Sequence, residues 1–106
     1  MTESQFLRNV EATLADVESA LDDAEIPAQC SLSALVLTIE FDNGAKIIVN
    51  AQTPMQQLWL AARSGGMHFA FDGKHWYDLR SGVEFFEALS RVVSEQLGQD
   101  VSLRPR

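Results

Sequence analysis

The chain has 106 residues, of which 46% are hydrophobic and 22% are charged, and its formal net charge is −7. This length fits one domain with its own core, so we interpret residues 1–106 as a single domain of ordinary globular composition. The acidic balance argues against nucleic-acid binding through phosphate contacts, and no apolar run approaches the roughly 20 residues of a membrane-spanning helix.

The first residues lack both the basic segment and the apolar segment of a secretory signal. The single cysteine, Cys30, excludes an internal disulfide and suits a reducing compartment. We therefore expect a cytoplasmic protein. The apolar strand context around Cys30 predicts a buried and unreactive thiol.

The first 25 residues carry most of the net charge. They hold seven of the fifteen carboxylates and one basic residue, Arg8, which gives a formal charge of −6 (one minus seven). Within residues 4–24, apolar side chains recur at steps of three and four, as on one helix face: Phe6, Val10, Leu14, Val17 and Leu21. Ser4 or Thr2 can cap this helix, and Pro27 prevents it from continuing.

The acids border the apolar stripe of the predicted helix on two sides. At about 100° per residue, Glu11, Glu18 and Asp22 share one flank. Glu25 joins that flank if the last helical turn persists, whereas Asp23 lies on the opposite one. The like charges at Glu18 and Asp22 repel, and acids near a helix C-terminus oppose the helix dipole. Two interpretations stay open: a solvated face that favours solubility, and a ridge that binds a cation or a basic partner.

Alternating apolar and polar residues predict a strand over 35–41 and a return strand over 45–50. Between them, Asp42-Asn43-Gly44 is a hairpin signal, because Asn-Gly tolerates the positive φ values of a type I′ turn. Residues 28–33 are expected to form a further short strand before this hairpin.

A tryptophan is expected on the open face of the sheet. The alternation over 57–61 turns Trp59 outward beside Gln57, on a face that Asn50 shares. An exposed tryptophan among polar side chains is typical of an interface anchor. In the alternative interpretation the alternation is shifted and Trp59 is buried. The residues that can extend this patch are Ile48, Met67 and His68.

The last hairpin is predicted around Asp72-Gly73, with strands over 67–71 and 74–79. A two-residue turn there pairs Phe69 with Trp76 on the inner face, and His68 with Tyr77 on the outer face. The second histidine, His75, is then expected to lie diagonally from His68, and both to be separately exposed.

The final helix has clear signals at both ends. Ser81-Gly82-Val83-Glu84 matches a capping box, and Gly98 ends the apolar stripe that follows it. Residues 99–106 are expected to form a frayed tail. A helix, five or six antiparallel strands and a second helix predict an α+β fold, a two-layer sandwich with the N- and C-terminal helices packed on one sheet face. The other face is left partly solvated.

The chain contains no histidine- or cysteine-based metal motif, no EF-hand spacing and no phosphate-binding loop. It also lacks a Ser-His-Asp order and a nucleophile elbow. A metal on the acids would therefore have oxygen ligands on an open surface, where binding is weak and poorly selective. Because paired acids without a cleft do not support catalysis, we do not expect an enzyme.

Several motifs resemble those of the frataxin family, in particular of its bacterial members. The most specific is the spacing N-x-Q-x-P-x-x-Q-x-W-L over residues 50–60. The similarity spans nearly the whole chain and includes these further matches: Asp42-Asn43-Gly44-Ala45-Lys46-Ile47-Ile48-Val49-Asn50, Gly65-Gly66, His68-Phe69, Trp76, Asp78, Arg80-Ser81-Gly82 and the Phe-rich last helix.

This resemblance implies an accessory or regulatory protein of iron–sulfur cluster assembly, with a cysteine desulfurase and a scaffold protein as partners. It implies weak surface binding of iron (Fe²⁺ or Fe³⁺) by an acidic ridge, which by position comprises Glu11, Glu18, Asp22, Asp23 and Glu25. It also implies a partner surface that comprises Asn50, Gln57 and Trp59. Relatives often continue the ridge into the first strand, whereas residues 26–31 contain no acid here, so this ridge is shorter.

Two other functions stay open beside this one. The first is an iron-handling ferroxidase or iron store, which needs an ordered site; no histidine lies near the acids in the sequence. The second is an iron-independent protein-interaction module. We expect a monomer in the absence of iron, with no nucleic-acid or membrane partner.

Overall fold

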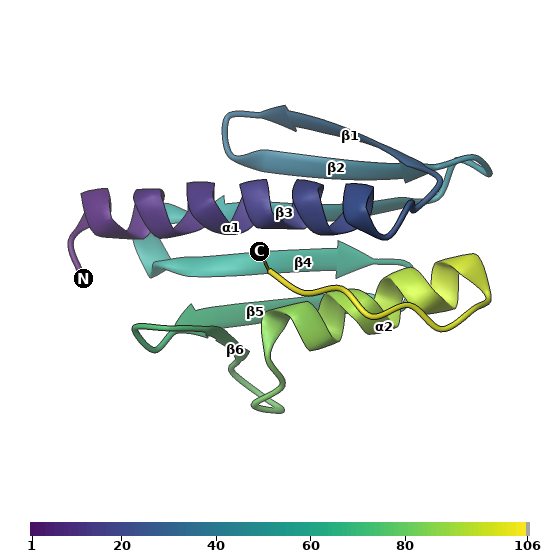
Figure 1. Cartoon of the computed structure of the whole chain (residues 1–106). Coiled ribbons are helices and arrows are strands. Elements are labelled where there is room, and N and C mark those ends of the chain that lie inside the picture. The colour runs from purple at the N-terminus through teal and green to yellow at the C-terminus, as the bar shows by residue number, and fades with distance from the viewer. Residues whose placement is uncertain (106) are drawn as a thin grey trace.

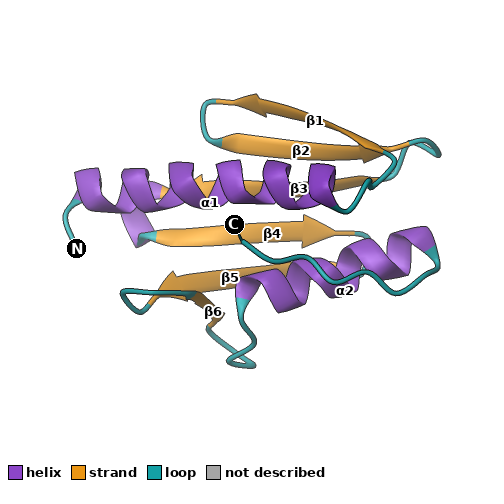
Figure 2. Ribbon diagram, in the orientation of Figure 1, coloured by secondary structure: helices purple, strands orange, loops and turns teal. Residues whose placement is uncertain are grey.

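The computed structural model describes residues 1–105 as a six-stranded antiparallel sheet with two helices on one of its faces (Figure 1; Figure 2). The strands neighbour one another in chain order. The elements are α1 (Glu3–Asp23), β1 (Ala28–Ser33), β2 (Val36–Phe41), β3 (Lys46–Gln52), the 3₁₀ turn η1 (Thr53–Met55), β4 (Gln57–Ala62), β5 (Gly65–Phe71), β6 (Trp76–Asp78) and α2 (Phe85–Leu97). The predicted α+β sandwich is thereby confirmed. Within residues 1–105, neither helix is long and apolar enough to cross a membrane.

Helix α1 is held on the sheet by its apolar stripe, all five predicted members of which are buried. A capping box starts the helix: the Gln5 N–H donates to the Thr2 hydroxyl (3.1 Å), and the Thr2 N–H donates to the Gln5 side chain (2.8 Å). Thr2 rather than Ser4 is therefore the N-cap.

Two tight turns join the first three strands. Ala34 and Leu35 have φ values of 50° and 61°, so a two-residue turn of type I′ joins β1 to β2, and β2 begins one residue later than predicted. The hairpin predicted from strands over 35–41 and 45–50 is confirmed, but its predicted type I′ turn is wrong. Of the residues in that loop only Gly44 has a positive φ (85°), and the Asn43 side chain instead accepts the Ala45 N–H (3.0 Å).

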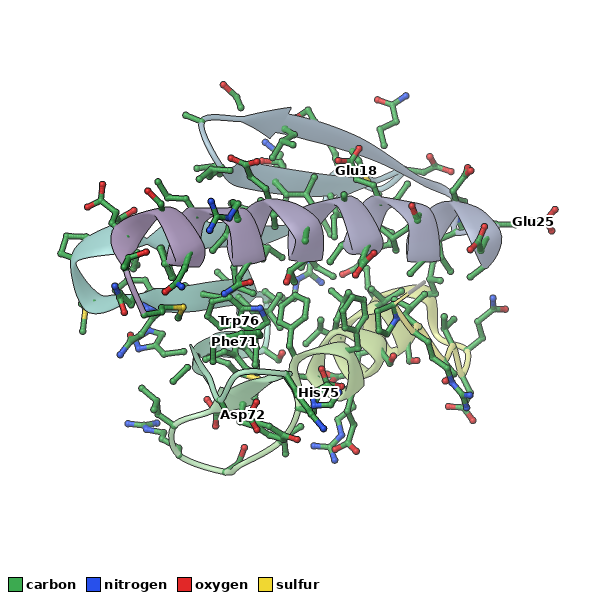
Figure 3. All side chains as sticks on the ribbon, turned by 60° about the vertical axis from the view of Figure 1, so that its left-hand side comes forward. Glu18, Glu25, Phe71, Asp72, His75 and Trp76 are labelled. Carbon is green, nitrogen blue, oxygen red and sulfur yellow. The ribbon has the colours of Figure 1, made fainter. Side chains whose placement is uncertain are left out.

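The predicted two-residue turn between β5 and β6 is also wrong, because the loop has four residues. One oxygen of Asp72 accepts the N–H groups of Lys74 (2.9 Å) and His75 (2.8 Å), which stabilises the longer loop. The resulting register pairs Phe71 with Trp76, Ala70 with Tyr77 and Phe69 with Asp78. Figure 3 shows Asp72 and His75 at this turn, with Phe71 and Trp76 together on the side of α1.

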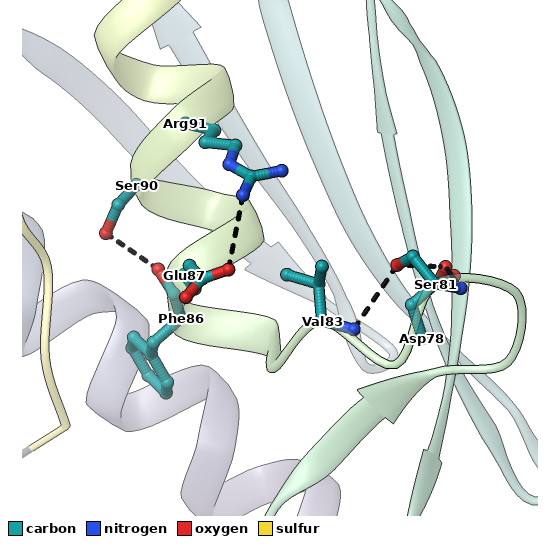
Figure 4. Close-up of polar contacts among 7 residues, drawn as sticks. All are labelled: Asp78, Ser81, Val83, Phe86, Glu87, Ser90 and Arg91. Carbon is teal, nitrogen blue, oxygen red and sulfur yellow. Dashed lines mark hydrogen bonds and ion pairs between the residues drawn. The ribbon is translucent and has the colours of Figure 1, made fainter.

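Helix α2 begins four residues after the predicted cap, so the predicted capping box is wrong. The Glu84 backbone is extended and bridges to Tyr77, so Glu84 is itself the N-cap and accepts the Phe86 N–H (2.9 Å). Ser81 instead donates both its N–H and its hydroxyl to one oxygen of the buried Asp78 carboxylate, each at 2.8 Å (Figure 4). Gly98 ends the helix as predicted, at φ 71°.

The segment over residues 99–105 is anchored on the molecule at Val101 and Leu103, so the prediction of a frayed tail is wrong there; residue 106 lies outside the described residues. The Val101 N–H donates to the Ser94 hydroxyl and the Leu103 N–H to the Ser90 hydroxyl, both at 2.8 Å. Leu103 is 3% exposed and belongs to the core. The segment runs back between α1 and α2 (Figure 1), so it closes the helical layer.

Candidate functional site

Two acids of the predicted acidic ridge lie together on the flank of α1 that faces β1. Glu18 and Asp22 are exposed and, with Ala28 and Cys30 of β1, line an open groove between the helix and the sheet edge. Figure 3 shows Glu18 projecting on the side of the β1–β2 hairpin. A spacing of four residues on a helix brings the two Cβ atoms to about 5–6 Å. Within residues 1–105, neither carboxylate forms an ion pair.

The other three acids of the ridge do not join this pair in one cluster. Glu11 lies two turns earlier on the same flank, and Asp23 borders a separate hollow with Arg104. Glu25 follows the end of α1 in a left-handed conformation (φ 53°) and projects away from the helix in Figure 3. Among residues 1–105, no three His, Cys, Asp or Glu side chains are arranged to hold one metal ion.

Glu25 leaves the flank because the helix ends in a Schellman motif. The Ile26 N–H donates to the Leu21 carbonyl and the Glu25 N–H to the Asp22 carbonyl, both at 3.0 Å. The last turn therefore does not persist beyond Asp23, which was the condition for Glu25 to align with the flank.

Cys30 was predicted to be buried, and this prediction is wrong: its side chain is exposed. Its strand, β1, lies at the edge of the sheet, where the two helices do not cover it (Figure 1). Partial desolvation, together with the negative charge of Glu18, raises the pKa of the Cys30 thiol. The thiol therefore stays protonated at neutral pH. The sequence prediction failed because the local sequence does not indicate that β1 is an edge strand.

The predicted partner surface lies on the open face of the sheet, as the alternation of β4 indicated. Trp59 is half-buried and stands between Asn50 and His68 in one row across three strands. The rings of Trp59 and His68 stack with centroids 4.1 Å apart and planes 9° apart, and the Trp59 N–H donates to the Gln57 side chain (2.9 Å). The stacking contact and the hydrogen bond hold the Trp59 ring in one orientation within this row.

The predicted extension of this patch is correct for His68 and wrong for Met67. Met67 pairs with the buried Leu60 and packs against the core, because residues directly opposite each other in a sheet share a face. Ile48 is half-buried beside Ala61, on the face that carries Trp59. His75 lies in the β5–β6 turn, with its ring 6.0 Å from that of Tyr77, and both histidines are exposed as predicted.

Comparison with known proteins gives consistent results for the whole chain. The family described as "Frataxin-like domain" matches residues 1–99. The chain is 49% identical over 105 residues to the "Iron-sulfur cluster assembly protein CyaY" of Paraburkholderia phymatum, and the match covers 99% of this chain and 100% of that protein. It is 51% identical over 109 residues to the protein of the same name from a Janthinobacterium species, with coverage of 98% and 97%.

Solved structures agree. A frataxin from Psychromonas ingrahamii, described as belonging to the CyaY family, matches with a TM-score of 0.90 at 30% identity, over 96% of this chain and 97% of that one. A trimeric frataxin from Saccharomyces cerevisiae, solved in complex with ferrous ion, matches with a TM-score of 0.61 at 28% identity, over 92% and 86%. The fold, the motif over residues 50–60 and these matches agree, and the chain belongs to the frataxin family.

Proposed function

We propose that this protein is an iron-binding accessory protein of iron–sulfur cluster assembly, which docks on a cysteine desulfurase and contacts the scaffold protein. The observation that carries the proposal is the pair of exposed, neighbouring carboxylates at Glu18 and Asp22, which no ion pair within residues 1–105 neutralises. The names of relatives at about half identity support the assembly role. The role is that of a binding protein, not of an enzyme.

Iron would be held weakly at the Glu18–Asp22 pair. Two carboxylate oxygens suit a hard cation, and on an open surface water supplies the remaining ligands. Glu11 extends the pair along the same flank, while Asp23 and Glu25 add negative potential from the sides without joining it. The yeast frataxin solved with ferrous ion supports iron as the cation.

NMR with the ¹⁵N-labelled protein tests this assignment. Addition of Fe²⁺ or Co²⁺ is expected to broaden the amide signals around Glu18 and Asp22 first. The double variant Glu18→Gln, Asp22→Asn should lose this early broadening, whereas Glu95→Gln, which removes one exposed acid from α2, should keep it. Broadening centred on His68 and His75 would show that the site assignment is wrong.

Docking on the desulfurase would use the same carboxylates against a basic surface, and the scaffold protein would meet the Trp59 face. A cation bound at Glu18 and Asp22 would then weaken docking, since one ligand neutralises the charge that the other needs. Titration of the desulfurase with this protein should give a weaker affinity when Fe²⁺ is present than when it is absent. An unchanged affinity would exclude the competition.

Two rival functions predict different results. A ferroxidase would turn over, so oxygen consumption with excess Fe²⁺ would continue beyond the amount of protein present; we expect it to stay stoichiometric. An iron-independent interaction module is favoured by the lack of a three-ligand cluster within residues 1–105. It predicts that Glu18→Ala with Asp22→Ala abolishes partner binding while no metal perturbs the NMR spectrum of the unmodified protein.

A further inference from the structure

The two edge strands of the sheet, β1 and β6, differ in whether their outer backbone groups are paired. The β6 edge is three residues long and closed, because Tyr77 bridges to Glu84 and the Asp78 N–H donates to the Val83 carbonyl (2.9 Å). The β1 edge is six residues long, lies at the end of the strand order and pairs with no other segment of residues 1–105 on its outer side (Figure 1). It contains no proline and no charged residue, which are the usual protections of an edge strand.

The turn between β1 and β2 determines which backbone groups face this open edge. In a two-residue hairpin the residues that flank the turn form a hydrogen-bonded pair, and such pairs alternate along the ladder. Ser33 pairs with Val36 at the turn, so every second residue of β1 before it also bonds to β2. The residues between them therefore direct their N–H and C=O groups outward: Ala28, Cys30 and Leu32. Among these groups, the Ala28 N–H donates to the Ile26 carbonyl (2.8 Å), and no other segment of residues 1–105 pairs with the rest.

The side chains of these outward-bonding residues lie on the α1 side of the sheet. Cys30 and Leu32 stand opposite Ile39 and Leu37, which are buried under the helices. Leu32 is nevertheless 48% exposed, because the helical layer does not reach this strand. The groove that carries Glu18 and Asp22 runs along the same side. A strand added to β1 would thus place every second side chain beside these acids.

We propose that the free edge of β1 accepts an extended partner segment with basic residues at alternate positions, which adds to the sheet as a seventh strand. The main chain of the segment bonds to the N–H and C=O groups around Cys30 and Leu32, and its basic side chains reach Glu18 and Asp22. This inference rests on the docking role proposed for the acidic pair, and it adds the backbone mode of recognition.

The charge at the edge favours a basic partner over a second copy of this chain. Each copy carries a net charge of −7, and joining two β1 edges would bring two acidic grooves together. Like charges placed side by side oppose association, whereas alternating lysines neutralise the acids.

A synthetic peptide, acetyl-TKVKTKV-amide, serves as the probe in an NMR titration at low salt. We expect the amide signals of Cys30 and Leu32 to shift and their hydrogen exchange to slow. A version of the peptide that is N-methylated at alternate amides keeps the charge but cannot form the ladder, so it should bind at least about tenfold more weakly.

The matched protein variants are Cys30→Pro and Cys30→Thr. Proline at this position removes only an outward N–H and leaves the β1–β2 ladder intact, which edge strands tolerate. It should weaken peptide binding at least about tenfold relative to threonine. Strand addition would be overturned if the two variants bound the peptide equally well and the N-methylated peptide bound as tightly as the unmodified one. Docking through charge alone would still stand. If Cys30→Pro does not fold, the N-methylated peptide decides the question.

The double variant Glu18→Gln, Asp22→Asn tests the acids that this inference shares with the proposed function, whereas the Cys30 variants test strand addition alone. Loss of peptide binding in this variant is expected, and unchanged binding would contradict the docking role of the acids as well as strand addition beside them. Sedimentation of the protein alone provides the last check. If the protein sediments as a dimer and the Cys30→Pro variant as a monomer, a second copy occupies the edge. That result would overturn the choice of a basic partner.

Discussion

Glu18 and Cys30 interact across the groove between α1 and β1, although twelve residues of sequence separate them. The negative charge of Glu18 adds to desolvation in raising the pKa of the thiol. A thiolate is the reactive form of cysteine, so its fraction at a given pH reports the local potential. Cys30 is therefore a built-in probe of the acidic pair.

Glu18→Gln should lower the pKa of Cys30 and speed its alkylation by iodoacetamide at pH 8. Because desolvation is the larger cause of the raised pKa, we expect only a modest effect of about twofold. Glu11→Gln, two helical turns away on the same flank, is the matched control and should change the rate less. Equal rates in both variants would show that Glu18 does not act on the thiol.

The backbone conformation of Glu25 is unfavourable for any residue except glycine. Its left-handed backbone disfavours any residue with a Cβ, and its charge opposes the dipole at the end of α1. Glu25→Gly should raise the free energy of unfolding by about 1 kcal/mol. Glu25→Gln removes the charge alone and should gain only a few tenths of that, as urea denaturation can measure. If both variants are equally stable, the backbone strain is negligible.

At the scale of elements, Asp78 joins the end of β6 to the start of α2. Its buried carboxylate accepts two hydrogen bonds from Ser81, which shape the turn that leads to the helix (Figure 4). Burial alone would raise the pKa of this carboxyl, but the hydrogen bonds from Ser81 and the further backbone N–H groups outweigh it and lower the pKa. The charged form is thus the one that the fold stabilises.

Asp78→Asn should reduce the free energy of unfolding at pH 7 by roughly 1–3 kcal/mol, the range for hydrogen bonds to a charged group. Since the folded pKa lies below the unfolded value of about 4, the contribution of Asp78 is fully present above that pH. This contribution is lost as the pH falls through the folded pKa. The difference in free energy of unfolding between Asp78→Asn and the parent should therefore narrow in that pH range. Asp42→Asn, in an exposed turn, is the control. A difference that is constant with pH would contradict this account.

At the scale of the whole molecule, the C-terminal segment completes the helical layer. Two helices alone leave the space between them open, and Leu103 fills it while serines 90 and 94 of α2 bond to the segment's backbone. Ala20 and Asp23 of α1 border the same segment from the other side. The segment therefore joins α1 to α2 within the helical layer.

Leu103→Ala should lower the free energy of unfolding by about 2–4 kcal/mol, because it removes a buried side chain and leaves a cavity. Ser102→Ala, at the exposed neighbouring position, should have little effect. Urea denaturation of the two variants makes the comparison. A loss below about 0.5 kcal/mol for Leu103→Ala would indicate that the segment does not contribute to the core.

The order of the helices and strands, and the face that each one buries, could be predicted from the sequence. Period and alternation depend on neighbours in the chain, so the stripe of α1, the inward Leu58 and Leu60 and the outward Trp59 were all predictable. The flank that holds Glu18 and Asp22 followed from the same helical geometry.

The turns, the tail and the surroundings of the acids became known only from the structure. Hydrogen bonds of Asp72 and Asp78 with nearby backbone groups replaced the expected turn and cap, because side chains compete with the backbone for the same donors. Leu103 is buried because distant elements leave a space for it. Cys30 is exposed, and lies beside Glu18, because β1 is an edge strand, and an edge is a property of the assembled sheet.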